Sequence, residues 1–185
     1  MAGSGRRHDA RRTNRWGKVI WGGAVLLLML PAVAMQFTNE VNWDETDFIV
    51  VGMLLAAACG IYELGARLSR NTWYRAAFGV AIVTAFMLVW LNLAVGVIGN
   101  EDNPANLFFG GVLAIAIVGA LLVRFRAHGM ARVFDLTAIA QAAMAAYALF
   151  AGPYVKGAVL SLLFAMAWLV AARLFRIAGR QQGAA

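Results

Sequence analysis

Residues 76–98 read AAFGVAIVTAFMLVWLNLAVGVI and contain no charged side chain. A helix of this length crosses the roughly 30 Å of hydrocarbon in a bilayer, because each residue adds about 1.5 Å. Similar apolar stretches precede and follow it, and they predict six transmembrane helices at residues 19–37, 47–66, 76–98, 104–123, 133–154 and 157–174. The sequence therefore predicts an all-α integral membrane protein, a six-transmembrane-helix bundle with short loops.

The composition of the chain favours the same class. Hydrophobic residues make up 62% of the 185 residues and charged residues 14%, and the mean hydropathy is +0.72. A soluble domain is about half apolar and a quarter charged. These values exclude a disordered chain, a coiled coil and an ordinary cytosolic enzyme. We predict a basic cytoplasmic tail at 1–18, a transmembrane domain at 19–174 and a cytoplasmic carboxyl tail at 175–185.

The basic residues predict how the chain is threaded. With these six helices, every Lys and Arg among the sixteen except Lys156 falls on one side of the membrane. Positively charged residues are retained on the cytoplasmic side. We therefore expect a bacterial inner-membrane protein with both termini in the cytoplasm. The first helix ends near Ala32-Val33-Ala34, a sequence of the kind that signal peptidase cuts, but we expect it to be kept as a signal anchor.

Two of the helical hairpins share a weak sequence similarity. A parallel repeat of one hairpin would produce such matches, as in several transporter folds. Chance similarity between apolar helices is the alternative explanation. The matches, at an offset of 59 residues, pair Gly52 with Gly111, Gly60 with Gly119 and Arg67 with Arg126.

Small residues at four-residue spacing predict where helices pack closely. Burying leucine gives little drive for association in lipid, whereas small residues allow two backbones to approach. These rows of small residues mediate helix contacts either within the bundle, in a homodimer or in a larger membrane complex. The sequence does not distinguish between these contacts. The helix-packing candidates are Gly52, Ala56 and Gly60 in the second helix and Ala138, Ala142 and Ala146 in the fifth.

Three polar residues in the predicted spans are candidates for a transport path: Glu63, about one turn from the cytoplasmic edge, and Asn92 and Gln141 at depth. Glu63 is an acid inside an apolar stretch, and ionisable groups in spans are functional candidates by default. The structural alternative is an ion pair with Arg67, four residues further along the helix. For Asn92 and Gln141 the alternative is hydrogen bonding between helices.

Acids and amides are concentrated in the loops on the side opposite to the arginines. Their oxygen atoms are the ligands that Ca²⁺ and Mg²⁺ prefer, and they would also form a cation-collecting mouth. The spacing of an EF-hand is absent, and a plain solvated surface is the alternative. The outer cation-binding candidates are Asp44, Glu45, Asp47, Glu101, Asp102 and Asn103.

Other ligands and chemistries have little support in the sequence. The single cysteine, Cys59, and the two histidines, His8 and His128, give no haem or zinc ligand set within the apolar stretches. We expect no cofactor, and we find no catalytic set of residues. The net charge of +7 is explained by contact between the arginine-rich face and anionic lipid headgroups. Nucleic acid is not an expected partner, since no known binding motif accompanies the charge.

Three functions are compatible with these features. The first is a small-solute or cation permease with an acidic outer mouth. The second is a non-catalytic membrane subunit or assembly factor of a larger complex. The third is a lipid-modifying enzyme at the outer face. A permease predicts a continuous polar cavity that reaches Glu63. A subunit predicts a dry core with a lipid-avoiding face for another chain, and an enzyme predicts a carboxylate-lined pocket that opens sideways to lipid.

Overall fold

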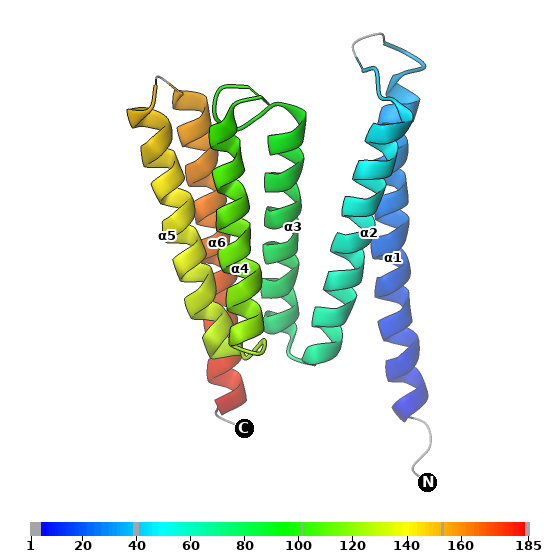
Figure 1. The fold of residues 1–185 in the computed structure, drawn as a ribbon. Coiled ribbons are helices and arrows are strands. Elements are labelled where there is room, and N and C mark those ends of the chain that lie inside the picture. The colour runs from blue at the N-terminus through cyan, green and yellow to red at the C-terminus, as the bar shows by residue number, and fades with distance from the viewer. Residues whose placement is uncertain (1–4, 39–40, 101, 153, 184–185) are drawn as a thin grey trace. The chain divides into compact units, whose positions relative to one another are not determined.

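The computed structural model describes residues 5–38, 41–100, 102–152 and 154–183, with side chains from Gly17 onward. These residues are helical apart from short connections (Figure 1). The elements are α1 (Gly5–Ala34), α2 (Glu45–Leu68), α3 (Thr72–Ala94), the short 3-10 helix η1 (Pro104–Leu107), α4 (Phe108–Leu122), α5 (Ala127–Phe150) and α6 (Val155–Gly183).

The helices confirm the predicted membrane class. Six helical segments in the described residues, counting η1 and α4 as one, are long and apolar enough to cross a membrane. The chain is thus a multi-pass transmembrane helix protein. Some helices extend beyond the predicted spans: α5 begins at Ala127 rather than at residue 133, and α6 continues to Gly183. A helix does not end where hydrocarbon ends, because polar residues continue it into the headgroup region.

The chain divides into two compact units, Met1–Glu63 and Leu64–Ala185, which we call unit 1 and unit 2. Unit 1 contains α1 and most of α2, joined as a hairpin. The segment of α1 from Gly17 to Ala34 contains no buried residue. Within unit 1, Trp21 Nε1 donates a hydrogen bond of 3.3 Å to Glu63 Oε1, and a Cβ on Gly52 would lie 3.6 Å from Leu28 Cδ2. These contacts link α1 to α2 within unit 1.

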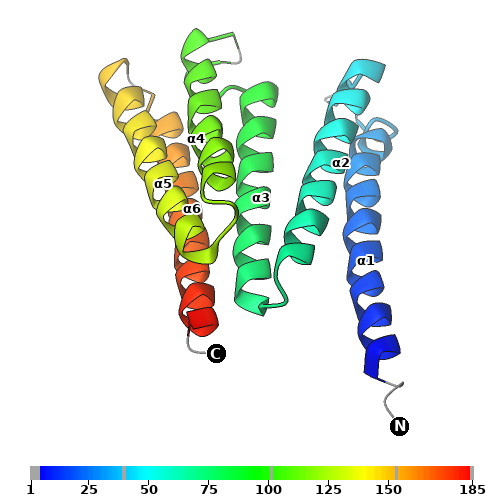
Figure 2. The same ribbon diagram turned by 60° about the horizontal axis from the view of Figure 1, so that its bottom comes forward.

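Unit 2 is a bundle of α3, α4, α5 and α6. Consecutive helices run in opposite directions (Figures 1 and 2). The most extensive packing is between α5 and α6, and α6 also packs on α3 while α5 packs on α4. The starts of α3 and α5 and the ends of α4 and α6 therefore meet at one end of unit 2. We call it the arginine end, because these helix termini carry Arg75, Arg124, Arg126 and Arg180.

The core of unit 2 consists of two apolar clusters. The first lies toward the arginine end and is rich in stacked aromatic rings: Phe134 lies 5.4 Å from Trp168 and 5.5 Å from Phe175, centroid to centroid. The second lies toward the opposite end and includes Leu88, Ile98 and other apolar residues of all four helices. The buried polar side chains lie near the boundary between these two clusters.

The connection from α3 to α4 is a folded element in its own right. Gly96 and Gly99 adopt positive φ angles of 66° and 75°, a conformation that glycine takes at little cost. Asn106 Oδ1 accepts hydrogen bonds from the backbone N–H groups of Val97 and Ile98 at 3.1 and 2.9 Å, and Asn106 Nδ2 donates to the carbonyl of Asn100 at 2.7 Å. One side chain thus orders most of this loop.

Candidate functional site

A layer of buried polar side chains crosses the middle of unit 2. In the described part of the chain, the polar side chains that are buried are Thr84 on α3, Thr137 and Gln141 on α5, and Ser161 on α6. Thr84 and Gln141 lie where the two apolar clusters meet along their helices, and Thr137 and Ser161 lie near that level. We call these four residues the polar layer.

The helix register brings Gln141 and Ser161 to the same level. Phe134 on α5 stacks on Trp168 of α6. Residues seven positions apart share a helix face, and Gln141 and Ser161 each lie seven positions from one of these aromatic residues, in the direction away from the arginine end. In an antiparallel pair, this places the amide and the hydroxyl on the facing sides of α5 and α6. Both side chains have no exposed surface.

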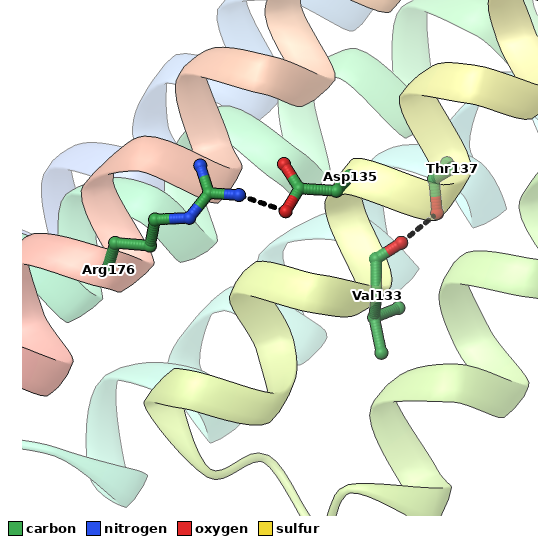
Figure 3. Close-up of polar contacts among 4 residues, drawn as sticks. All are labelled: Val133, Asp135, Thr137 and Arg176. Carbon is green, nitrogen blue, oxygen red and sulfur yellow. Dashed lines mark hydrogen bonds and ion pairs between the residues drawn. The ribbon is translucent and has the colours of Figure 1, made fainter.

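The hydroxyls of the two threonines are satisfied within their own helices. Thr84 Oγ1 donates to the carbonyl of Val80 at 2.7 Å, and Thr137 Oγ1 donates to the carbonyl of Val133 at 2.9 Å (Figure 3). Such bonds to the preceding turn are common for threonine in helices. These two residues therefore contribute little hydrogen-bonding capacity to the interior.

The amide of Gln141 is different, because neither of its polar atoms has a partner. Among the described residues, no group bonds Gln141 Oε1 or Nε2, and the same holds for Ser161 Oγ and Trp168 Nε1. A buried polar group without a partner costs about 1 to 3 kcal/mol. A glutamine amide can make up to four hydrogen bonds. Among the described residues, Gln141 and Ser161 therefore leave hydrogen-bonding capacity unused in the interior of unit 2.

Asn92 lies two turns beyond Thr84 on α3, away from the arginine end. Its Nδ2 donates to the carbonyl of Leu88 at 2.7 Å, whereas its Oδ1 is buried without a partner in the described residues. Asn92 and Gln141 thus both belong to unit 2, while Glu63, half-buried and bonded to Trp21, belongs to unit 1. A single path through all three residues stays a prediction.

Several of the predicted outer cation ligands cap helices. Asp44 Oδ1 accepts from the N–H of Asp47 at 2.9 Å, and Asp47 Oδ2 accepts from the N–H of Asp44 at 3.0 Å, a reciprocal cap at the start of α2. Glu45 lies exposed in the same first turn. Asn103 Oδ1 accepts from the N–H of Ala105 at 3.0 Å and caps η1. Asp44, Asp47 and Asn103 therefore have local structural roles at helix starts.

The cation site itself stays a prediction. Asp102 is exposed in unit 2, Glu101 lies outside the described residues, and Asp44, Glu45 and Asp47 belong to unit 1. Among the residues that the structure describes, no group of three or more His, Cys, Asp or Glu side chains is placed to hold a metal ion.

The predicted packing residues lie in different environments. Gly52 faces Leu28, whereas Ala56 and Gly60 are exposed and a Cβ on Gly60 would meet no atom of unit 1 within 4 Å. On α5, Ala138 is buried, Ala142 is half-buried and Ala146 is exposed. These three alanines turn progressively away from the core, because a four-residue spacing exceeds the 3.6 residues of a helical turn.

One ion pair was missed by the sequence analysis. Arg176 on α6 pairs with Asp135 on α5, near the arginine end (Figure 3). Their side chains are 44% and 28% exposed, so the pair lies at the edge of the helix interface. The contact joins two segments 41 residues apart, and only the register of the α5–α6 hairpin reveals it. The ion pair links α5 to α6, the two helices that carry Gln141 and Ser161 of the polar layer.

Comparison of the chain with protein-family models, with curated proteins and with solved structures found no match.

Proposed function

We propose that the protein is an inner-membrane permease for a small polar solute, with both termini in the cytoplasm. The observation that carries this proposal is the amide of Gln141, fully buried and without a partner among the described residues. It lies at the level where the two apolar clusters of unit 2 meet. Polar groups inside membrane bundles commonly mark the pathway of a substrate.

The chemistry of the polar layer favours an uncharged solute over a cation. The side chains that supply unpartnered polar atoms there are an amide, a hydroxyl and an indole, from Gln141, Ser161 and Trp168. Together they donate and accept hydrogen bonds but bring no formal charge. In the cation alternative, Glu63 supplies the charge and the outer acids supply the mouth. Urea and glycerol are uncharged solutes that both donate and accept hydrogen bonds, and they serve as probes of this proposal.

The test is a flux measurement on the purified full chain in proteoliposomes. Stopped-flow light scattering reports the permeability to glycerol and urea, and an entrapped dye reports proton and potassium entry. We expect Gln141→Leu to lower the permeability to at least one solute about tenfold, the effect of losing roughly 1.4 kcal/mol of hydrogen bonding. Ile139→Leu, at a position that is 66% exposed on the same helix, is the matched control.

Two results would contradict the solute proposal. The first is a permeability to every solute that equals that of empty liposomes. The second is a cation flux that Glu63→Gln abolishes and Gln141→Leu leaves unchanged, which would support the cation alternative instead.

Thermal unfolding in detergent separates a path residue from a structural one. Hydrogen bonds between transmembrane helices contribute about 0.6 to 2 kcal/mol, so a structural Gln141 would lose stability as leucine. Because its amide has no partner among the described residues, we expect the unfolding midpoint of Gln141→Leu to equal or exceed that of the unchanged protein. A lower midpoint would assign Gln141 to helix packing.

A membrane subunit of a larger complex is the second candidate, and α1 favours it. Within unit 1, no residue from Gly17 to Ala34 is buried, and a Cβ on Gly22 or Gly23 would meet none of the described atoms of this unit within 4 Å. Small residues on an open helix face allow another helix to approach closely. Mild-detergent purification of the full chain from its native membrane tests this function. A stoichiometric partner together with inactive proteoliposomes would favour the subunit over the permease.

A further inference from the structure

A shallow cavity of about 530 Å³ lies at the arginine end of unit 2, where α4 turns into α5. It is lined by Leu122, Val123, Arg124, Arg126, His128 and Gly129. Arg124, Arg126 and His128 are exposed. Among the described residues, no acceptor bonds either guanidinium group, in contrast to Arg176, which pairs with Asp135. Two cations without a partner therefore border one cavity.

The backbone that carries these two arginines is ordered. Arg124 and Phe125 adopt positive φ angles of 51° and 57°, and the N–H of Phe125 donates to the carbonyl of Ala120 at 3.1 Å. Tyr74 Oη donates to the carbonyl of Phe125 at 2.8 Å and ties the turn to α3. Hydrogen bonds to α4 and to α3 thus order the turn, and Arg124 and Arg126 belong to this ordered segment.

The start of α5 adds partial positive charge to the same place. Arg126 is the residue before the helix, and no side chain caps the first turn. The first backbone N–H groups of a helix lack partners within it and favour an anion. His128 and Gly129 belong to this first turn and also line the cavity. The two guanidinium groups and the helix start therefore favour the same kind of ligand.

The apolar surroundings distinguish a lipid from a free anion. Leu122 lines the cavity and is 77% exposed, and on α4 next to it Leu121, Val118 and Ile117 are 59%, 52% and 61% exposed. In a helix long and apolar enough to span a membrane, such a face lies against acyl chains. A ligand with an anionic head and hydrocarbon tails would use both surfaces.

We propose that this cavity binds the phosphate of an anionic phospholipid headgroup, with Arg124 and Arg126 as its cationic ligands and the exposed face of α4 beneath its acyl chains. Guanidinium groups bind phosphate oxygens in bidentate fashion. The site is separate from the polar layer, so that the proposal does not depend on the permease function.

The experiment measures lipid-dependent stabilisation of the full chain in nonionic detergent. The thermal unfolding midpoint is followed as phosphatidylglycerol is titrated into the micelles, with phosphatidylcholine and inorganic phosphate as separate arms. We expect phosphatidylglycerol to raise the midpoint. In the double variant Arg124→Asn/Arg126→Gln, we expect about tenfold more lipid to be needed, because each arginine contributes a few-fold to affinity. Asparagine tolerates the left-handed backbone of residue 124.

The matched control removes the same charge elsewhere on the same end. Arg173→Gln/Arg180→Gln changes two exposed arginines of α6 that do not line the cavity, and it should need no more lipid than the unchanged protein. If the double variant folds poorly, the single variant Arg126→Gln replaces it, since that side chain makes no capping bond. This variant is expected to need about threefold more lipid than the unchanged protein. Equal losses in variant and control, or equal stabilisation by phosphatidylcholine or by inorganic phosphate, would overturn the proposal.

Discussion

Asn106 and Gln141 carry the same amide group and use it in opposite ways. Asn106 forms hydrogen bonds with the backbone of Val97, Ile98 and Asn100, so that both of its polar atoms are used to order the α3–α4 connection. Gln141 has no partner for either atom among the described residues. In the sequence both stand out as polar residues near apolar stretches. Only the contacts show that the amide of Asn106 is bonded to the backbone, whereas that of Gln141 has no partner among the described residues.

The role of Asn106 leads to a graded prediction for stability. Asn106→Asp keeps the acceptor for Val97 and Ile98 but replaces the donor to Asn100 with a second acceptor, while Asn106→Leu loses all of these bonds. Leaving backbone groups unpaired costs about 1 to 3 kcal/mol. We expect the unfolding midpoint in detergent to fall in the order unchanged protein, Asn106→Asp, Asn106→Leu. Asn100→Leu, whose side chain is exposed, should leave it unaltered, and equal midpoints for all four proteins would refute this role.

At the scale of elements, α5 and α6 form the framework of unit 2. Their interface holds the stacked rings of Phe134, Trp168 and Phe175 at one level and the facing Gln141 and Ser161 at another. The first turn of α6 also contacts the folded α3–α4 connection, because Gly157 lies directly against the carbonyl oxygen of Val97. That contact fixes the connection to the helix pair that carries the polar layer.

The closeness of Gly157 to Val97 predicts the effect of adding one methyl group. In Gly157→Ala the new Cβ would overlap a backbone oxygen, which cannot move like a side chain. We expect a loss of about 1 to 3 kcal/mol in the free energy of unfolding, the usual effect of overpacking. The new Cβ of Gly110→Ala on α4 would meet none of the described atoms within 4 Å, and the change should be neutral or stabilising because alanine favours helix. Denaturant unfolding in mixed micelles would compare the two; a neutral Gly157→Ala would contradict the contact.

At the scale of the whole molecule, the sequence was sufficient to predict the helices but not the contacts between them. Apolar length alone predicted six helical segments, because a bilayer demands about 20 apolar residues for each crossing. The pairing of Asp135 with Arg176 and the alignment of Gln141 with Ser161 depend on helix rotation and register, which apolar composition does not specify. The caps at Asp44 and Asn103 can be expected from the sequence alone, because each residue directly precedes a helix start, a position that favours Asp or Asn.

The threading of the chain is the last prediction, and it follows from where the arginines collect. If the arginine end of unit 2 is cytoplasmic, a membrane-impermeant maleimide should label intact cells at Asn100→Cys and Ala151→Cys, each made in a Cys59→Ala background. His128→Cys and Gly183→Cys should react only after permeabilisation. These four positions are exposed, and none replaces an arginine, so the charges that direct insertion stay in place. Labelling of His128→Cys in intact cells would show the opposite topology, with the arginine end outside the cytoplasm, and would place the proposed lipid site in the outer leaflet.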